Sequence, residues 1–297
     1  MVTPKYRNIG DLRKPITKDT ENMIAEIKDC SSFLQWALPK MKMRWRGFRK
    51  VKRQVCKRLL LRMQELHIHN HQSYREFLDK HPQEWEKLEK LTHISISRFF
   101  RDYKSWEMLG KKLLPSLAAN AARHKRDLNC WSAGCASGEE PYSLALLWNH
   151  KLASEFPGLT MHILATDADE HLLQRAWQSC YPESNVKHVP KEWFQKSFQQ
   201  QEKDIFCLDK NICQKVDFKK QDIRKEMPEG PFDLVFCKNL VGMYFVHDQA
   251  VEIFNKISIR MQPAGILMLG NHEPFPEREV DSIYVFNRGL NIYQKKG

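Results

Sequence analysis

The sequence predicts an α/β protein in which a mostly parallel sheet carries helices on both faces and follows a smaller, all-helical N-terminal domain. From Glu21 to about Thr92, apolar residues recur at helical spacing. After about Leu113, short apolar runs alternate with helical stretches, starting with LNCW and EEPYSLALLW. Alternating strands and helices indicate a parallel sheet, because each crossover helix returns the chain to the same end of the sheet.

The length of 297 residues is enough for about two domains. We expect a polar extension over residues 1–19, a helical domain over 20–104 and an α/β domain over 105–297. The stretch 181–217 interrupts the alternation and predicts a small inserted subdomain. No stretch reaches the roughly 20 apolar residues of a membrane span, and the first residues lack the apolar core of a signal peptide. We therefore expect a cytoplasmic protein without membrane insertion.

Neither the cysteines nor the histidines predict a metal site. The eight cysteines include no C-x-x-C pair, so we expect mostly buried thiols in a reducing compartment rather than a disulfide framework. HIHNH at 67–71 could place three imidazoles on one face if extended, but it lies between two expected helices and is interpreted as a polar connector. The cysteines are Cys30, Cys56, Cys130, Cys135, Cys180, Cys207, Cys213 and Cys237.

One short segment carries almost all of the formal net charge of +12. Between Pro39 and Met63 there are 11 Lys or Arg residues and no acid, so 48 minus 11 leaves 37 basic residues against 36 acidic ones elsewhere. Within FRKVKRQVCKRLLLRM, Val51, Val55, Leu59 and Met63 recur every four residues, which predicts a helix with an apolar stripe. Its cationic flank could be solvated or could bind an acidic partner. The flank contains Lys52, Arg53, Lys57 and Arg58.

The stretch SAGCASGEEPYS at 132–143 predicts a turn between a strand and a helix. Ligands of open parallel sheets bind beyond the carboxyl ends of the strands, where a glycine such as Gly134 lets the backbone approach the ligand. A pyrophosphate site favours G-x-G-x-x-G, whereas Glu139 and Glu140 would repel a phosphate. Two carboxylates suit S-adenosylmethionine (AdoMet), which carries an ammonium, a sulfonium and a ribose diol but no phosphate.

Helix capping offers a competing explanation for these acids. Ser137 and Glu140 stand at capping-box spacing, while Pro141 as the first helical residue would make Glu140 the cap, and the two placements exclude each other. In MHILATDAD, Asp167 ends an apolar run, where Rossmann-like folds place an acid that binds a ribose diol. Asp169 is more simply the N-cap of the next helix.

Seven short segments stand in a distinctive order along the chain. They are SRFFRD at 97–102, WSAGCASGEEPYSLAL at 131–146, ATDAD at 165–169, QDI at 221–223, GPFDLVFCKN at 230–239, YF at 244–245 and PAGILMLGNHE at 263–273. On these segments the chain resembles the CheR-type protein-glutamate methyltransferases over roughly residues 20–275. The resemblance implies a helical N-terminal domain, a Rossmann-like class I AdoMet methyltransferase domain with an inserted β-subdomain, and methylation of glutamates on chemoreceptor helices.

The resemblance also implies roles for individual residues. We expect Arg101 and Tyr244 to orient cofactor and acceptor, although Arg101 could instead pair with Asp102 or Glu107, and Tyr244 could be a core aromatic. The phenylalanines of SRFFRD are expected to pack in the core. Cofactor contacts are expected from Ser95, Ser97, Arg101, Gly134, Glu140, Asp167, Asp222, Ile223, Lys238 and Asn239, with Asp222 otherwise capping a turn. The basic helix implies substrate contacts from Arg49, Lys52, Arg53 and Lys57.

The chain departs from the family pattern near the substrate side. Ser95 and Ser97 replace an expected Asn and Thr, and Lys238 replaces an Arg whose planar fork can hold a carboxylate. One extra residue lies between Asn239 and Tyr244, and G-N-H-E replaces G-H-S-E. These departures leave the identity of the methyl acceptor open.

Three classes of function are therefore considered. We predict a carboxyl O-methyltransferase acting on glutamates of an acidic, receptor-like helix; an ionised carboxylate needs no general base at neutral pH. The first alternative is a methyltransferase for a small molecule or a nucleic acid, but the chain lacks a distributed basic surface and an N-P-P-[FY] motif. The second alternative is a non-catalytic AdoMet-binding module.

Overall fold

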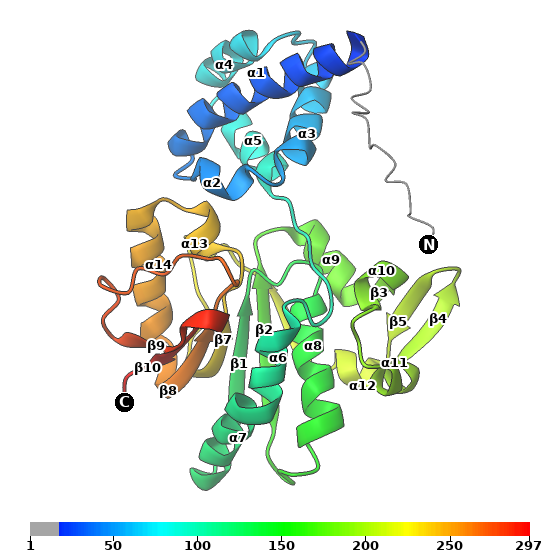
Figure 1. The fold of residues 1–297 in the computed structure, drawn as a ribbon, viewed down its shortest axis with the longest axis vertical. Coiled ribbons are helices and arrows are strands. Elements are labelled where there is room, and N and C mark those ends of the chain that lie inside the picture. Colours follow the sequence, from blue (N-terminus) through cyan, green and yellow to red (C-terminus); the bar gives the residue numbers. More distant parts are fainter. Residues whose placement is uncertain (1–17) are drawn as a thin grey trace, which may run out of the picture.

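The computed structural model describes residues 18–297, with side chains from residue 29 onward, and has a helical N-terminal part above an α/β part (Figure 1). The predicted α/β class with a preceding helical region is confirmed. Of the predicted extension 1–19, residues 1–17 lie outside the described residues, while Lys18 and Asp19 already belong to the first helix. In the described residues, no helix is both long enough and apolar enough to cross a bilayer.

The helical part holds its own apolar core. Its helices are α1 (Lys18–Lys40), α2 (Trp45–Phe48), α3 (Lys52–Glu65), α4 (His71–Lys80) and α5 (Glu84–Thr92). Val55, Leu59 and Met63 of the predicted apolar stripe are buried where α3 packs against α1 and α5, which confirms an amphipathic α3. HIHNH spans the connector from α3 to α4 and ends at His71, the first residue of α4. The side chain of Asn70 caps α4, and His71 bonds Asp29 at 2.6 Å.

The α/β part is built on a seven-stranded sheet with the order β6-β2-β1-β7-β8-β10-β9, counted over the described residues. β1 pairs in parallel with β2 and β7, and β10 lies antiparallel between β8 and β9. The strand order reverses between β1 and β7, which is where open sheets form a ligand crevice. The strands are β1 (Leu128–Ala133), β2 (Met161–Asp167), β6 (Val216–Lys220), β7 (Phe232–Phe236), β8 (Met261–Met268), β9 (Ile283–Asn287) and β10 (Ile292–Lys295).

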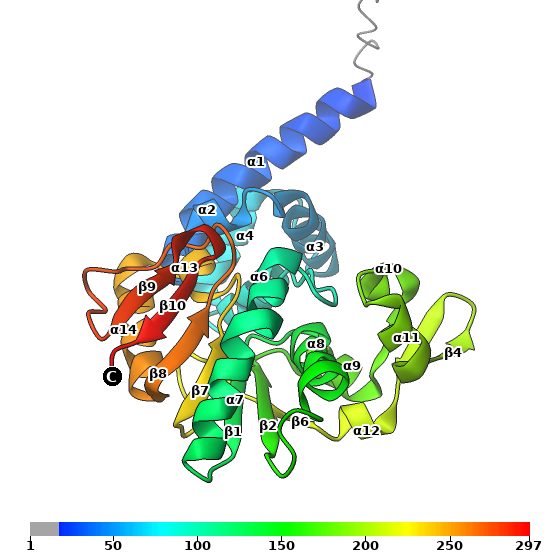
Figure 2. The same ribbon diagram turned by 60° about the horizontal axis from the view of Figure 1, so that its bottom comes forward.

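Helices cover both faces of this sheet (Figures 1 and 2). Successive strand residues point to opposite faces, so Cys130 of β1 belongs to the core under α6, α7 and α8, and Trp131 to the core under α14. Phe99 and Phe100 are buried in the first core, as predicted. The elements are α6 (Tyr103–Met108), η1 (Leu109–Leu113), α7 (Leu114–Arg123), α8 (Glu139–Leu147), η2 (Trp148–Leu152), α9 (Glu170–Gln178), α13 (Val241–Tyr244), α14 (His247–Ile259) and η3 (Arg288–Leu290).

A small three-stranded antiparallel sheet, with the order β3-β5-β4, is inserted between α9 and β6. Figure 2 shows it to one side of the main sheet. Its elements are β3 (Cys180–Pro182), α10 (Glu183–Val186), α11 (Lys191–Ser197), β4 (Phe198–Glu202), β5 (Ile205–Leu208) and α12 (Lys210–Cys213). Val216 and Asp217, which we placed in the insertion 181–217, pair with β2 in the main sheet. The boundaries 20–104 and 105–297 stay an interpretation.

The prediction of free thiols is wrong for four of the eight cysteines. Cys30 on α1 is disulfide-bonded to Cys56 on α3, and Cys180 on β3 to Cys207 on β5. Both pairs come together through tertiary or cross-strand contacts, which sequence spacings of 26 and 27 residues do not reveal. The remaining thiols are those of Cys130, Cys135, Cys213 and Cys237.

Candidate functional site

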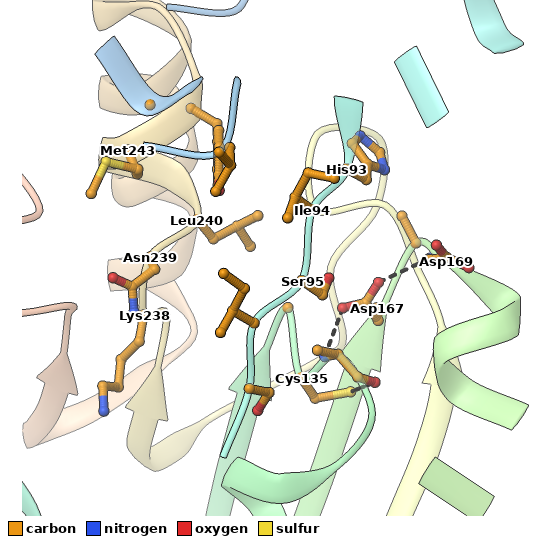
Figure 3. A pocket seen from close by; sticks show the side chains of 18 of the residues that line it. His93, Ile94, Ser95, Cys135, Asp167, Asp169, Lys238, Asn239, Leu240 and Met243 are labelled. Atoms are coloured by element: carbon orange, nitrogen blue, oxygen red, sulfur yellow. Dashed lines mark hydrogen bonds between the residues drawn. The ribbon is translucent and has the colours of Figure 1, made fainter. Parts of the chain in front are cut away.

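A cavity of about 630 Å³ lies between the helical part and the carboxyl ends of β1, β2 and β7. Figure 3 shows its walls, with Asp167 and Cys135 on one side and Lys238, Asn239 and Leu240 on the other. Every residue predicted to contact the cofactor lines this cavity, and so does Tyr244; their roles stay predictions. The lining residues that were predicted are Ser95, Ser97, Arg101, Gly134, Glu140, Asp167, Asp222, Ile223, Lys238, Asn239 and Tyr244.

The turn after β1 depends on its glycines rather than on a side-chain cap. Gly134 has a φ of +73°, and a Cβ there would lie 2.7 Å from a methyl group of Leu240. Gly138, with a φ of +89°, is the N-cap of α8. Both capping predictions are therefore wrong, because neither Ser137 nor Glu140 caps the helix. The N-cap is the left-handed Gly138, one residue after Ser137 and two before Glu140.

The two adjacent glutamates point to different places. Glu139 is fully buried, where it accepts hydrogen bonds from Ser137 Oγ at 2.9 Å and from Asn185 Nδ2 of α10 at 2.7 Å. Glu140 faces the cavity, and its Oε1 accepts a hydrogen bond from Ser132 at 2.8 Å. Glu139 thus ties the inserted sheet to the turn, and Glu140 alone of this pair is placed for a ligand.

A buried lysine stands beside Glu140. The Lys238 side chain is 4% exposed, and its Nζ lies 3.8 Å from Glu140 Oε2 and 3.4 Å from Asp102 Oδ2. The same Nζ lies 5.8 Å from the ring centre of Trp106. Burial raises the pKa of Glu140, and the charge of Lys238 opposes that rise. Lys238 therefore offsets part of the negative charge that Glu140 and Asp102 bring to the floor of the cavity.

Asp167 closes the end of β2 with both of its carboxylate oxygens engaged. They accept hydrogen bonds from the backbone N–H of Ala136 at 2.8 Å and of Asp169 at 2.9 Å (Figure 3). Burial raises the pKa of Asp167 despite these bonds. Asp169 caps α9 by accepting from the N–H of His171 at 2.9 Å, as predicted. Asp167 is thereby held rigidly at the cavity wall.

Asp222 lies in an ion-pair chain that the sequence did not reveal. Arg224 donates to Asp222 through Nε at 2.9 Å and Nη2 at 2.6 Å, and its Nη1 lies 2.5 Å from Glu89 of α5. Burial alone would raise the pKa of Asp222, but the bonds from Arg224 outweigh it and lower the pKa. The Arg224 N–H also bonds Asp222 Oδ1 at 3.0 Å, so the turn-capping alternative holds as well.

The two predicted catalytic residues occupy different surroundings. Arg101 is exposed, and its guanidinium donates to the carbonyl of Ile96 at 2.8 Å. Its suggested alternative partners are engaged elsewhere, because Asp102 pairs with Lys238 and Glu107 lies 2.6 Å from the Nζ of a lysine. Tyr244 is half-buried and contacts the cores of both parts of the molecule. Burial raises its pKa, so its hydroxyl is a hydrogen-bond donor at neutral pH.

Backbone contacts fix the helical part over this cavity. The N–H of Arg44 donates to the Tyr244 carbonyl at 2.7 Å, and the N–H of Val246 donates to the Lys42 carbonyl at 3.0 Å. A Cβ at Gly47 would lie 2.9 Å from the Tyr244 ring, so the absence of a side chain lets α2 pack directly on α13. The cavity roof is therefore set by main-chain geometry.

The cationic segment divides into two groups. Arg46, Arg49 and Lys50 line the cavity, so one of the four predicted substrate-binding cations does so. Lys52, Arg53 and Lys57 lie on α3 outside the lining. Arg58, expected on the cationic flank, instead donates to the carbonyl of His93 at 2.7 Å. Arg46 and Lys50, which the helical pattern did not single out, precede α3. The apolar residues of that segment have no regular spacing that would have indicated a role for its cations.

One further buried acid was not singled out from the sequence. Glu273, the last residue of the segment GNHE, accepts hydrogen bonds from the backbone N–H of Asn239 at 2.5 Å and of Leu240 at 3.0 Å. An acid five residues after a strand and three after a glycine is a weak signal for this role, and its targets are 33 and 34 residues away. A still larger separation in sequence concealed the bond from Arg224 to Glu89.

The chemistry of the lining fits AdoMet. Glu140 and Asp167 offer carboxylates at the sheet edge, where an ammonium group and a ribose diol need acceptors. The turn at Gly134 brings backbone to the cavity wall, a cradle that a Cβ would fill. In the described residues, no group of three or more side chains could hold a metal ion.

Comparison with known proteins agrees with this geometry. The family model described as "CheR methyltransferase, SAM binding domain" matches residues 95–288, more than half of the chain. A chemotaxis protein methyltransferase of Borreliella burgdorferi is 31% identical over 209 residues, 69% of this chain and 74% of that protein. Chemotaxis protein methyltransferase 2 of Vibrio cholerae is 31% identical over 235 residues (74% and 76%), and the chemotaxis protein methyltransferase of Escherichia coli 26% over 232 residues (76% and 77%). The chain belongs to the CheR methyltransferase family and is an AdoMet-dependent methyltransferase.

Proposed function

We propose that this enzyme methylates glutamate side chains on an acidic helical surface of a chemoreceptor-like protein. The supporting observation is that one cavity combines an acidic floor with a cationic rim. Carboxylates of Glu140 and Asp167 stand at the sheet edge, while Arg46 and Arg49 line the opposite, helical side. A cation-lined entrance attracts an acidic acceptor, and an acidic floor suits a positively charged cofactor. The names of the relatives point to the same class of substrate.

When bound, AdoMet supplies an electrophilic methyl group on a sulfonium. Glu140, Asp167 and Asp222 are the side chains that would hold it, with Lys238 balancing the charge of Glu140. A glutamate acceptor is already ionised at neutral pH, so the chain needs no general base for it. What remains for the protein is to align the acceptor and to exclude water, which is worth several kcal/mol.

Arg101 and Tyr244 are proposed to perform this alignment. Both line the cavity, and neither is engaged in an ion pair that would withdraw it from a ligand. The guanidinium of Arg101 can bind a carboxylate, and the Tyr244 hydroxyl can donate a hydrogen bond. We also place the enzyme in the cytoplasm, because AdoMet is a cytoplasmic cofactor.

Transfer of a labelled methyl group tests the acceptor class directly. The full chain is incubated with methyl-labelled AdoMet and a helical receptor fragment carrying exposed glutamates, and base-released methanol is counted. A fragment with those glutamates changed to glutamine serves as the control. Base-labile label on the glutamate fragment alone supports the proposal. Label on nucleic acid, or cofactor binding without any transfer, would instead favour one of the two alternatives.

A further inference from the structure

Glu273 is a buried carboxylate that binds backbone rather than a cation. The residue is 3% exposed and lies just after β8, at the edge of the sheet where the cavity opens. Its Oε2 accepts from the N–H of Asn239 at 2.5 Å and of Gly270 at 3.1 Å, and its Oε1 accepts from the N–H of Leu240 at 3.0 Å. A carboxylate that accepts several N–H donors organises the backbone around it.

The backbone that Glu273 holds has an unusual conformation. Asn239 has a φ of +57°, and Leu240 has a φ of −126° with a ψ of −83°. The φ of Asn239 falls in the left-handed region, which Asn adopts more readily than most residues, whereas Leu240 lies outside the main allowed regions, so surrounding contacts have to hold it there. This loop runs from Lys238 to Tyr244 and is one residue longer than the resemblance leads one to expect. A carboxylate that engages two consecutive N–H groups can hold such an extra residue in place.

Small residues and a second polar side chain complete the support. A Cβ at Gly242 would lie 2.1 Å from the carbonyl oxygen of Pro274, so the loop packs directly on the backbone after Glu273. From the other side, Asn291 Nδ2 donates to the carbonyls of Gly270 at 2.6 Å and of Glu273 at 2.7 Å. Glu273 is therefore itself fixed before it fixes the loop.

We infer that Glu273 is a positioning residue for methyl transfer. Its carboxyl group holds the loop 238–244 so that Lys238, Asn239 and Tyr244 all line the cavity. It acts through those residues, because it does not itself line the cavity. The inference deepens the proposed function and rests on it for the acceptor used in the assay. It also gives a use to the acid that ends the GNHE segment.

Four titratable groups face Glu273 from the elements packed around it. Arg44 faces it from the segment before α2, Tyr244 from α13, Cys237 from the end of β7 and Tyr293 from β10. Burial raises the pKa of both tyrosines and of the cysteine, and it lowers that of Arg44 from the usual guanidinium value. Burial raises the pKa of Glu273 to about 7, against the opposing effect of the backbone N–H groups. Because the pKa is raised in the folded state, the ordered loop is favoured while Glu273 holds its proton, and loop order is expected to decline as the pH rises through about 7.

The test uses the full chain and compares Glu273→Gln with Glu277→Gln. The first change keeps the shape but turns an NH₂ group toward backbone donors, whereas Glu277 only pairs with Arg288 at the surface. Three properties are measured: kcat and KM for the receptor fragment between pH 6 and 8.5, the calorimetric stoichiometry of AdoMet binding, and amide hydrogen exchange over residues 237–245. Glu273→Asp, which retains the charge, is included in case the glutamine variant folds poorly.

For Glu273→Gln we expect kcat to fall about 10- to 100-fold, as for other displaced catalytic groups, with the AdoMet stoichiometry still near one. The wild-type rise in exchange over 237–245 as the pH increases through about 7 should disappear, exchange should be higher within 237–245 alone, and Glu273→Asp should recover part of the rate. An unchanged rate and exchange would overturn the inference. A fall in kcat that is matched by an equal fall in the stoichiometry of AdoMet binding would also overturn the inference, because it would indicate a merely structural role for Glu273. If the wild type methylates no receptor fragment, the acceptor proposal fails, while hydrogen exchange still decides the role of Glu273.

Discussion

Gly134 shows how much one residue of the site depends on having no side chain. Its backbone is left-handed, and a Cβ would lie 2.7 Å from Leu240, which itself lines the cavity. Gly158 has a similar φ of +83° but open space around it. The two glycines therefore separate backbone strain from a steric effect on the cofactor site.

Gly134→Ala is expected to weaken AdoMet binding by about tenfold or more, because Leu240 has to move and the cavity wall moves with it. Gly158→Ala should cost about 1–2 kcal/mol of unfolding free energy through its φ alone and should leave the affinity unchanged. Calorimetric titration and denaturant unfolding of both variants measure these quantities. Equal AdoMet affinities for the two variants would contradict the steric explanation.

Glu273 also gives the stability of the protein a pH dependence whose sign is fixed. Its pKa is raised to about 7 in the folded state, above the usual value of 4.5, so the folded state retains a proton that the unfolded state has lost. Its contribution is fully favourable below about pH 4.5 and is lost as the pH rises toward 7. In the wild type, this loss should lower the free energy of unfolding by about 2–3 kcal/mol between pH 4.5 and pH 7. In Glu273→Gln this decline should be absent. Denaturant unfolding at pH 5 and pH 8 measures it, and an unchanged slope in the variant would contradict it.

At the scale of elements, α5 is tied to the loop after β6 by a single arginine. Arg224 bonds Asp222 through two nitrogens and reaches Glu89 of α5 with a third. Its guanidinium also lies 5.6 Å from the ring centre of Phe245. The arrangement joins the helical part to a loop that lines the cavity, so we expect occupancy of the cavity to affect how firmly α5 is held.

We expect Glu89→Gln to leave the bond from Arg224 to Asp222 intact while loosening α5. Breaking a partly buried ion pair should lower the unfolding free energy by about 1–3 kcal/mol. AdoMet should still bind, but thermal unfolding should show less stabilisation by AdoMet than in the wild type. Glu170→Gln, which removes an exposed pair with Lys220, is the matched control. A variant stabilised by AdoMet as much as the wild type would show that the two elements are independent.

How much the sequence could predict also differs from element to element. The alternation of strands and helices, the amphipathic α3, the buried phenylalanines and the Asp169 cap follow from local periodicity, and all are present. The cap of α8 was mispredicted because a left-handed glycine replaced a side chain. Contacts between distant segments, such as the disulfides and the bonds of Glu273, have no local signature and became visible only in the folded chain.

At the scale of the whole molecule, a positively charged surface lies at the opening of the cavity that is lined by the residues predicted to contact AdoMet. Arg46, Arg49 and Lys50 lie at the cavity, while Lys52 and Lys57 extend the positive surface along α3. An acidic acceptor approaching this face is drawn in over roughly a Debye length, about 8–10 Å at physiological salt. The rim is therefore expected to affect encounter more than the chemical step.

Arg46→Glu with Arg49→Glu should raise KM for the receptor fragment by about tenfold or more and should leave the AdoMet affinity within about twofold. The same reversal at Lys52 and Lys57, away from the cavity, should have a smaller effect. Initial rates between 50 and 300 mM salt measure both, since screening should narrow the difference between wild type and variant. A KM that does not respond to salt in the wild type would contradict electrostatic steering.

The short backbone pairing between Lys42–Arg44 and Tyr244–Val246 joins positions about two hundred residues apart. Through it, the segment that leads to the cavity-lining Arg46 and Arg49 and the segment of Tyr244, which is proposed to align the acceptor, share one piece of main chain. A lineage that adapts to a different target protein therefore cannot reshape its recognition surface freely. Each such change is transmitted to the catalytic geometry, and selection has to act on the two together.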